Sequence, residues 1–168
     1  MRVALAALLV LLLAACGDGG ALDPLAPMGR GRVVEAISSD LVMLDDGQAV
    51  KLAGLAYMPS DEPYATKATA ELRKLALGQE VELLSGGAPK DPFGRRVAHL
   101  RTVKGRRWIE GEMLEAGAAR VRTFPDNRAL AREMLEREAK ARVAKRGCGP
   151  CPSTRCVCRR RCASLTVS

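Results

Sequence analysis

Aromatic side chains are scarce in this chain: they make up 3% of its 168 residues, with one Trp, two Tyr and two Phe. A hydrophobic core therefore has to be assembled from Leu, Val, Ala and Met side chains. The chain also lacks an apolar run of about 20 residues, the length that a membrane-spanning helix needs. The uncharged run near its N-terminus, residues 3–15, is only 13 residues long. It is therefore too short to cross a membrane as a helix.

The N-terminal residues have the features of a cleaved export signal. Arg2 supplies positive charge, residues 3–13 an apolar region, and two alanines the small side chains that a signal peptidase requires. Cys16 follows directly, and the stretch Leu13–Cys16 resembles the lipobox of bacterial lipoproteins, in which the Cys becomes the lipidated first residue. The resemblance implies several acyl chains on Cys16, because one acyl chain binds a membrane only marginally. An ordinary signal peptide with a coincidental Cys is the alternative.

The chain divides into four segments by composition. Residues 1–15 are the predicted signal peptide, and residues 16–30 are a lipidated Cys followed by a flexible tether rich in Gly, Pro and Ala. Residues 31–147 are the predicted folded domain, and residues 148–168 form a tail rich in Cys and Arg that is predicted to be disordered. This organisation predicts an exported lipoprotein anchored in the membrane of the bacterial cell envelope, on its periplasmic face or at the cell surface.

The formal net charge of +8 is unevenly distributed along the chain. The signal peptide and the segment after Gly147 together carry five arginines and no acid, which leaves 22 cationic and 19 acidic side chains in residues 17–147. This is an ordinary balance for a folded domain. Nucleic-acid binding therefore cannot be inferred from net charge.

The hydrophobic pattern of the predicted domain indicates five strands and three helices. Alternating or continuous apolar residues predict strands at 32–37, 41–44, 48–55, 80–84 and 95–102. Apolar residues at helical spacing predict helices at 65–77, at 110–116, and after residues 125–127. The last helix is predicted to bury a stripe formed by Leu130, Met134, Leu135, Ala139 and Val143.

The order of these elements is three strands, a helix, then two strands. This is the order of the five-stranded Greek-key barrel called the OB-fold. The predicted fold class is therefore α+β and mainly β, with one helix between strands 3 and 4 and further helices at the C-terminus. The OB-fold hosts nucleic-acid binders, sugar binders and enzymes, so it does not by itself define a function.

Five stretches of the predicted domain, in order along the chain, resemble the staphylococcal nuclease (thermonuclease-like) family. They are GRVVEAISSDLVML at 31–44, VKLAGLAYMP at 50–59, YATKATAELRKL at 64–75, DPFGRRVAHL at 91–100 and IEGEMLEAGAARV at 109–121. The resemblance covers roughly residues 31 to 147. It implies Ca²⁺-dependent hydrolysis of phosphodiester bonds in nucleic acid. Such chemistry needs carboxylates on a hard cation, a base for water, and guanidinium groups on the phosphate.

The resemblance assigns the family's two metal-binding carboxylates to positions 40 and 56. Asp40 matches the first, although Ser38-Ser39-Asp40-Leu41 replaces the usual Asp-Gly-Asp-Thr. The second position is Ala56, which has no carboxylate. Asp40 would then be the single side-chain ligand, too few for a Ca²⁺ site unless Glu62 or backbone carbonyls substitute. The resemblance thus implies Ca²⁺ as a cofactor, whereas the residues present argue against it.

The remaining catalytic positions are also altered. The first phosphate-binding Arg of the family falls on Lys51, which keeps the charge but not the bidentate fork, and the second is retained as Arg95. The general-base Glu normally follows a Pro immediately. Ser60 occupies that place here, and Glu62, two positions later, is the candidate base.

These substitutions predict an eroded catalytic set. Losing one preorganised group of this kind typically lowers the rate on the order of 10²–10³. The leading interpretation is a non-catalytic or very weakly catalytic module that binds nucleic acid, another phosphate-bearing ligand or an envelope protein. One alternative is an active Ca²⁺-dependent nuclease that uses Asp40, Lys51, Glu62 and Arg95. The other is a structural envelope lipoprotein with an unused barrel cleft.

Two further features near the predicted fifth strand are ambiguous. His99 alternates with Val97 and Arg101 and has no evident partner in sequence, so we expect it on the surface. Residues 104–108, Lys-Gly-Arg-Arg-Trp, read as a hairpin tip with one packed Trp. The alternative is that this segment binds phosphate and stacks a base.

Five of the six cysteines lie in the tail, at Cys148, Cys151, Cys156, Cys158 and Cys162, and their pairing is unknown. An exported protein favours disulfides, although five is an odd number. A Zn²⁺ site is a second reading, but the tail has no scaffold for one. The third is a frameshift: the family usually continues after this Gly with an aliphatic residue and Trp, and one lost base converts codons for Gly-Leu-Trp-Ala into Gly-Cys-Gly-Pro.

Overall fold

The computed structural model describes residues 18–59 and 64–147. Cys16, the candidate base Glu62 and the five tail cysteines lie outside these residues. The predictions of lipidation, of a base at position 62, and of disulfides, zinc or disorder in the tail therefore remain predictions.

Five strands close into a barrel in the order β1-β2-β3-β5-β4. They are β1 (Ala26–Ser38), β2 (Leu41–Leu44), β3 (Ala49–Leu52), β4 (Glu80–Ser85) and β5 (Arg96–Thr102). Neighbouring strands are antiparallel except β3 and β5, which run parallel. The predicted fold, a five-stranded OB-type barrel in the α+β class, is confirmed.

Strand β1 is long enough to pair with two partners. Its first half pairs with β4 and its second half with β2, and register shifts at Pro27/Gly29, Val33/Glu35 and Ala36/Ser38 bend it between them. Such bulges increase twist and allow a sheet to close on itself.

The tether predicted at residues 16–30 is too long. From Asp18 onward the chain forms a short 3₁₀ helix, η1 (Asp18–Leu22), and then enters β1 at Ala26. Leu22 is fully buried in the main core. Gly, Pro and Ala are typical of linkers, but here they occupy a bulged strand, so composition alone misplaced the start of the domain.

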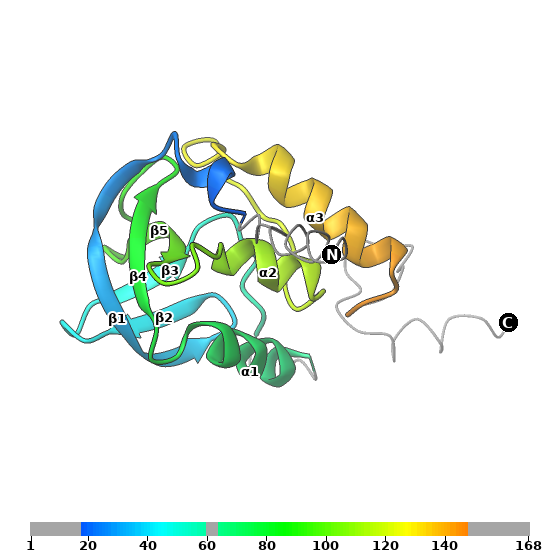
Figure 1. The fold of residues 1–168 in the computed structure, drawn as a ribbon, viewed down its shortest axis with the longest axis horizontal. Helices are drawn as coiled ribbons and strands as arrows, with labels where there is room; N and C mark the ends of the chain where they lie inside the picture. The colour runs from blue at the N-terminus through cyan, green and yellow to red at the C-terminus, as the bar shows by residue number, and fades with distance from the viewer. Residues whose placement is uncertain (1–17, 60–63, 148–168) are drawn as a thin grey trace, which may run out of the picture.

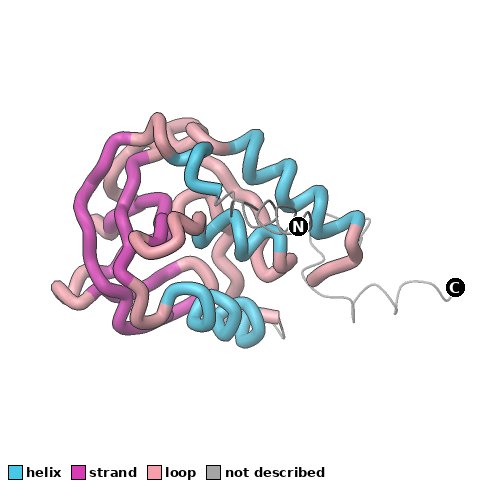
Figure 2. The backbone as a smooth tube through the Cα atoms, in the orientation of Figure 1, coloured by secondary structure: helices cyan, strands magenta, loops and turns pink. Residues whose placement is uncertain are grey.

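Three helices pack against the barrel (Figure 1). Helix α1 (Ala65–Ala76) connects β3 to β4, α2 (Ile109–Glu115) follows β5, and α3 (Ala131–Val143) ends the described chain. Helix α2 contacts β5 and both other helices. The helices and strands separate into two sides of the molecule in Figure 2, with the barrel on one side and the helices on the other. No helix in the described residues is long and apolar enough to cross a membrane.

The stripe predicted for α3 is partly wrong. Leu130 and Met134 are buried, but Ala139 is exposed, Leu135 is 54% exposed and Val143 is 86% exposed. The interior positions in this part of the helix belong to Arg137, Glu138 and Ala141. The two charged residues are partnered: Arg137 binds the carboxylate of Glu115 at 2.8 Å, and Glu138 accepts the backbone N–H of Val121 at 2.9 Å. Paired charges can occupy positions where a periodicity argument expects apolar side chains.

Candidate functional site

Asp40 lies in the turn between β1 and β2, where its carboxylate is 97% buried and fully partnered by neighbours. One oxygen accepts a hydrogen bond from the Ser38 hydroxyl, and the other binds the ammonium of Lys51, both at 2.9 Å. The Lys51 side chain is 20% exposed. The structure therefore brings together two of the residues singled out in the sequence, as an ion pair.

Arg95 lies at the end of a tight loop before β5, and Asp91 holds this loop in shape. One Asp91 oxygen accepts the backbone N–H groups of Phe93 and Arg95, and the other binds the Arg95 guanidinium at 2.7 Å. Burial alone would raise the pKa of Asp91, but the guanidinium and the backbone N–H groups outweigh it and hold that pKa below its ordinary value of 3.8. Arg95 is thus fixed in position, with its side chain 37% exposed.

Lys51 and Arg95 line the same pocket, which has a volume of about 330 Å³. Two further cationic side chains line it, Lys90 and Arg122, together with the acids Asp91 and Asp126. With Asp40, which pairs with Lys51, included, four positive groups are set against three negative ones around a cleft open to solvent. Such a pocket favours an anionic ligand.

Both phenylalanines of the chain line this pocket, and sequence reasoning missed them. Phe93 is 82% exposed and Phe124 is 47% exposed. A guanidinium lies over each ring: Arg95 at 5.2 Å from the Phe93 centroid and Arg122 at 5.5 Å from the Phe124 centroid. The available signal was the spacing Phe-x-Arg and Arg-x-Phe in a chain with so few aromatic residues.

The rim that carries Phe124 is held by a close approach of two backbones. The N–H of Ala88 donates to the carbonyl of Asp126 at 2.9 Å. A Cβ at Gly87 would lie 1.9 Å from the same oxygen, so only Gly fits there. This contact fixes the loop before α3 against the loop after β4, and with it the side of the pocket that carries an aromatic ring.

The sequence that forms this pocket was compared with protein-family models and with curated protein sequences. Residues 42–148 match the family model described as staphylococcal nuclease homologue, which covers more than half of the chain. The chain belongs to this family. A comparison with curated protein sequences found no match. The match begins within β2, so it covers most of the barrel, the three helices and the whole pocket.

Among the described residues, the metal position of this staphylococcal nuclease homologue offers few oxygen ligands for Ca²⁺. Both carboxylate oxygens of Asp40 already have partners, one of them a cation. Ala56 offers no side-chain oxygen, and its N–H is used by the carbonyl of Arg120 at 2.9 Å. Within residues 18–59 and 64–147, no group of three or more His, Cys, Asp or Glu side chains is placed to hold a metal. Ca²⁺ sites take six to eight oxygen ligands, and carboxylates usually dominate them.

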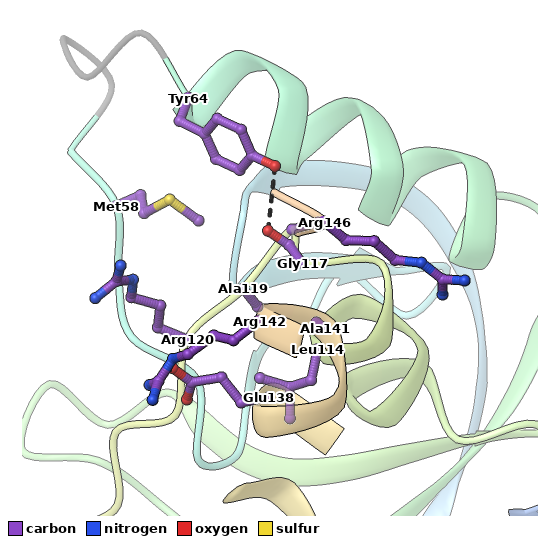
Figure 3. Close-up of a pocket in the computed structure, with 11 residues that line it drawn as sticks. Met58, Tyr64, Leu114, Gly117, Ala119, Arg120, Glu138, Ala141, Arg142 and Arg146 are labelled. Carbon is purple, nitrogen blue, oxygen red and sulfur yellow. Dashed lines mark hydrogen bonds and ion pairs between the residues drawn. The ribbon is translucent and has the colours of Figure 1, made fainter. Parts of the chain in front are cut away.

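A different and much smaller hollow is lined by the two described residues on either side of the candidate base (Figure 3). Met58 and Tyr64 stand on either side of the segment that contains Glu62, and neither lines the pocket of Lys51 and Arg95. The Tyr64 hydroxyl donates to the carbonyl of Gly117 at 3.1 Å, which ties the start of α1 to the end of α2. Glu62 itself is outside the described residues.

His99 is buried rather than on the surface, which corrects the sequence-based expectation. It is 1% exposed and packs edge-on against Trp108, with ring centroids 5.9 Å apart. Its Nδ1 lies 3.7 Å from a carboxylate oxygen of Glu110, which is fully buried. Burial lowers the pKa of His99 to about 4 and raises the pKa of Glu110 to about 8. Helix α2 and its preceding turn cover this side of β5, which alternation along a single strand cannot reveal.

Proposed function

We propose that this chain is a lipid-anchored staphylococcal nuclease homologue that binds single-stranded nucleic acid, or a similar phosphate-bearing polymer, without cleaving it efficiently. The observation that carries the proposal is a pocket lined by four cationic side chains and two exposed aromatic rings, each with an arginine over it. Non-specific binding of single strands uses the same combination, a basic groove for phosphates and aromatic faces on which bases stack.

Weak catalysis is supported by the state of Asp40. Its carboxylate is held by Ser38 and Lys51, and the partner position carries Ala56, so the described part of the chain leaves few oxygen donors for a hard cation. Lys51 also cannot donate the two parallel hydrogen bonds that a guanidinium offers a phosphate. Without the cation and one guanidinium, the pocket keeps the means to hold a phosphate but loses much of the charge stabilisation that cleavage requires.

Binding is supported by the placement of the remaining groups. Arg95 is held by Asp91 on one edge of its guanidinium, and its partial exposure leaves the other edge for a ligand. The rings of Phe93 and Phe124 each carry an arginine, so a stacked base would meet both an aromatic face and a cation.

A binding and cleavage assay tests the proposal. The chain from residue 17 onward, incubated with a labelled single-stranded oligonucleotide, is expected to bind it and to cleave it poorly, with no strong dependence on added Ca²⁺. Phe124→Ala should weaken binding about tenfold, since stacking one base contributes about 1–3 kcal/mol. Arg95→Ala should weaken binding and reduce the slope of log K against log salt by about 0.7.

The control is Arg132→Ala, because this arginine on α3 is 84% exposed and lies outside the pocket. It should leave binding unchanged. Efficient cleavage that requires Ca²⁺ and is abolished by Arg95→Ala would establish the nuclease alternative instead. Absence of any binding, with equal behaviour of all three variants, would favour the structural envelope role or an envelope protein as the partner.

The lipid anchor has a separate test. Cys16→Ala should release the protein from the membrane fraction or block processing of its signal peptide. Membrane attachment that is unchanged in this variant would contradict the anchor and leave the binding proposal unaffected.

A further inference from the structure

We infer that the lipid on Cys16 holds this domain directly against the bilayer through η1, so that the pocket stays close to the membrane surface. The inference rests on the lipid anchor proposed above. It adds where a bound ligand lies relative to the membrane, and it depends on how η1 is attached to the barrel.

Residues 18–25 provide almost no flexible chain length between the anchor and the barrel. Leu22 is fully buried among core residues, and the backbone N–H of Leu25 closes a turn onto the carbonyl of Leu22 at 3.1 Å. At Ala26 the chain is already paired with Ser85 of β4. The segment is therefore part of the folded domain rather than a flexible tether.

Asp23, which directly follows η1, attaches this helix to the outer face of the barrel through Arg101 and Arg106, and we call these contacts the clasp. One of its oxygens accepts hydrogen bonds from Arg101 on β5 and from Arg106 in the following turn, both at 2.7 Å. Arg101 is 8% exposed and also binds Glu82 of β4 at 2.8 Å, and Glu82 in turn pairs with Arg30 of β1. The network joins η1 to three strands, and this fixes the direction in which the chain leaves the barrel.

Covalent geometry then limits the distance to the anchor. One residue, Gly17, separates Cys16 from the first residue of η1, so their Cα atoms lie at most about 7 Å apart. Even a fully extended chain from Cys16 to Asp23 would span only about 25 Å. Acyl chains in the bilayer place Cys16 at the headgroup level. The end of the domain that carries η1 must therefore touch or nearly touch the headgroups.

The pocket lies on the same outer face of β5, beyond the clasp. Ala98 and Leu100 point into the barrel core, so Val97, His99 and Arg101 lie on the outer face of the barrel, where Trp108 packs against His99. Arg101 holds Asp23, and Val97 lines the pocket, about 13 Å further along the strand. Together, these two spans and the ion-paired side chains of Asp23 and Arg101 that join them keep the edge of the pocket within roughly 50 Å of Cys16. A polymer lying on the membrane surface is therefore within reach of the pocket.

Energy transfer from the native tryptophan measures this proximity. Trp108 is the only Trp of the chain and bridges to Arg101, so it reports the position of the clasp. The full lipidated chain is reconstituted into vesicles that contain a lipid with a dansyl-labelled headgroup. A second form carries 20 Gly/Ser residues between Gly17 and Asp18. Transfer from Trp108 should be strong in the native chain and fall by about half or more in the extended one, because such a linker spans roughly 25 Å.

The matched control places the same 20 residues after Gly147, where they do not lengthen the anchor, and should leave transfer unchanged. Binding of free oligonucleotide should be the same in all three forms and shows that each is folded. Equal transfer in the native and extended chains, while vesicle binding still requires Cys16, would overturn this inference and leave the anchor intact. Vesicle binding that persists in Cys16→Ser would instead overturn the anchor, and this inference with it.

Discussion

The buried carboxyl of Glu110 makes the stability of this domain depend on pH in a way that one substitution should remove. Glu110 is fully buried, and burial raises its pKa from 4.5 to about 8, although its oxygens accept the backbone N–H of Leu100 at 3.1 Å. Above pH 4.5 the unfolded chain releases this proton, while the folded chain keeps it until about pH 8. The free energy of unfolding should therefore fall by about 1.4 kcal/mol per pH unit across this window.

His99 has the opposite effect at lower pH. Burial lowers its pKa from 6.5 to about 4, so between these values the unfolded chain binds a proton that the folded chain does not. Stability from this group rises with pH up to 6.5 and offsets the fall due to Glu110. Above pH 6.5 the histidine is neutral in both states, and the loss due to Glu110 should appear alone, about 2 kcal/mol between pH 6.5 and 8. Transfer of this proton from Glu110 to His99 within the folded protein does not change the predicted pH dependence, because the pair as a whole still retains the proton.

Urea unfolding at several pH values between 6.5 and 8, followed by Trp108 fluorescence under reducing conditions, measures this loss. At pH 6.5 the free energy of unfolding of Glu110→Gln should be about 1–2 kcal/mol below that of the native chain, because the new amide N–H groups lack acceptors. It should not decline further with pH. The control is Glu136→Gln, whose carboxylate is 63% exposed and which should keep the native slope. If Glu110→Gln lost the same 2 kcal/mol between pH 6.5 and 8, the retained proton would not belong to this carboxyl, and the reasoning would fail.

Three further substitutions test the site and the chain end. Lys51→Met leaves the buried Asp40 carboxylate without its cation and should cost about 1–3 kcal/mol in urea unfolding, less than a fully buried pair because the Lys51 side chain is 20% exposed. Gly87→Ala places a Cβ against the carbonyl of Asp126 and should cost about 2–3 kcal/mol and weaken oligonucleotide binding, whereas Gly20→Ala, which meets nothing within 4 Å, should do neither. If the tail results from a frameshift, a chain with Leu-Trp directly after Gly147 should have a free energy of unfolding roughly 3 kcal/mol above that of the native chain. A stop codon at that point in the neighbouring reading frame would instead favour a genuine cysteine tail.

Several sequence-based expectations depended on local pattern and were accurate for that reason. Strand alternation and helical spacing located all five strands and α1 to within a few residues, apart from the early part of β1. The predicted strands at 41–44 and 48–55 are joined by a turn in which Gly47 adopts φ 76°, a conformation open to glycine without steric cost. These features are set by interactions between residues close in sequence, so the sequence carries them directly.

The errors arose where distant segments cover one another. Leu22 looked like part of a linker because nothing local shows that Arg101, 79 positions later, holds the residue that follows it. His99 looked exposed because the covering Trp108 belongs to another element. Leu135 and Val143 looked buried because their spacing is helical, yet the paired Arg137 and Glu138 take the inward positions.

For this protein the sequence by itself determined the family, the order of strands and helices, and which catalytic side chains are replaced, since each depends on residue identity and short-range periodicity. Only the tertiary structure decided what the surviving residues do. It paired Asp40 with Lys51, fixed Arg95 through Asp91, and gathered both phenylalanines around one basic pocket. Those contacts join residues from separate strands and loops, and barrel closure brings them together, a long-range packing event that no single segment encodes.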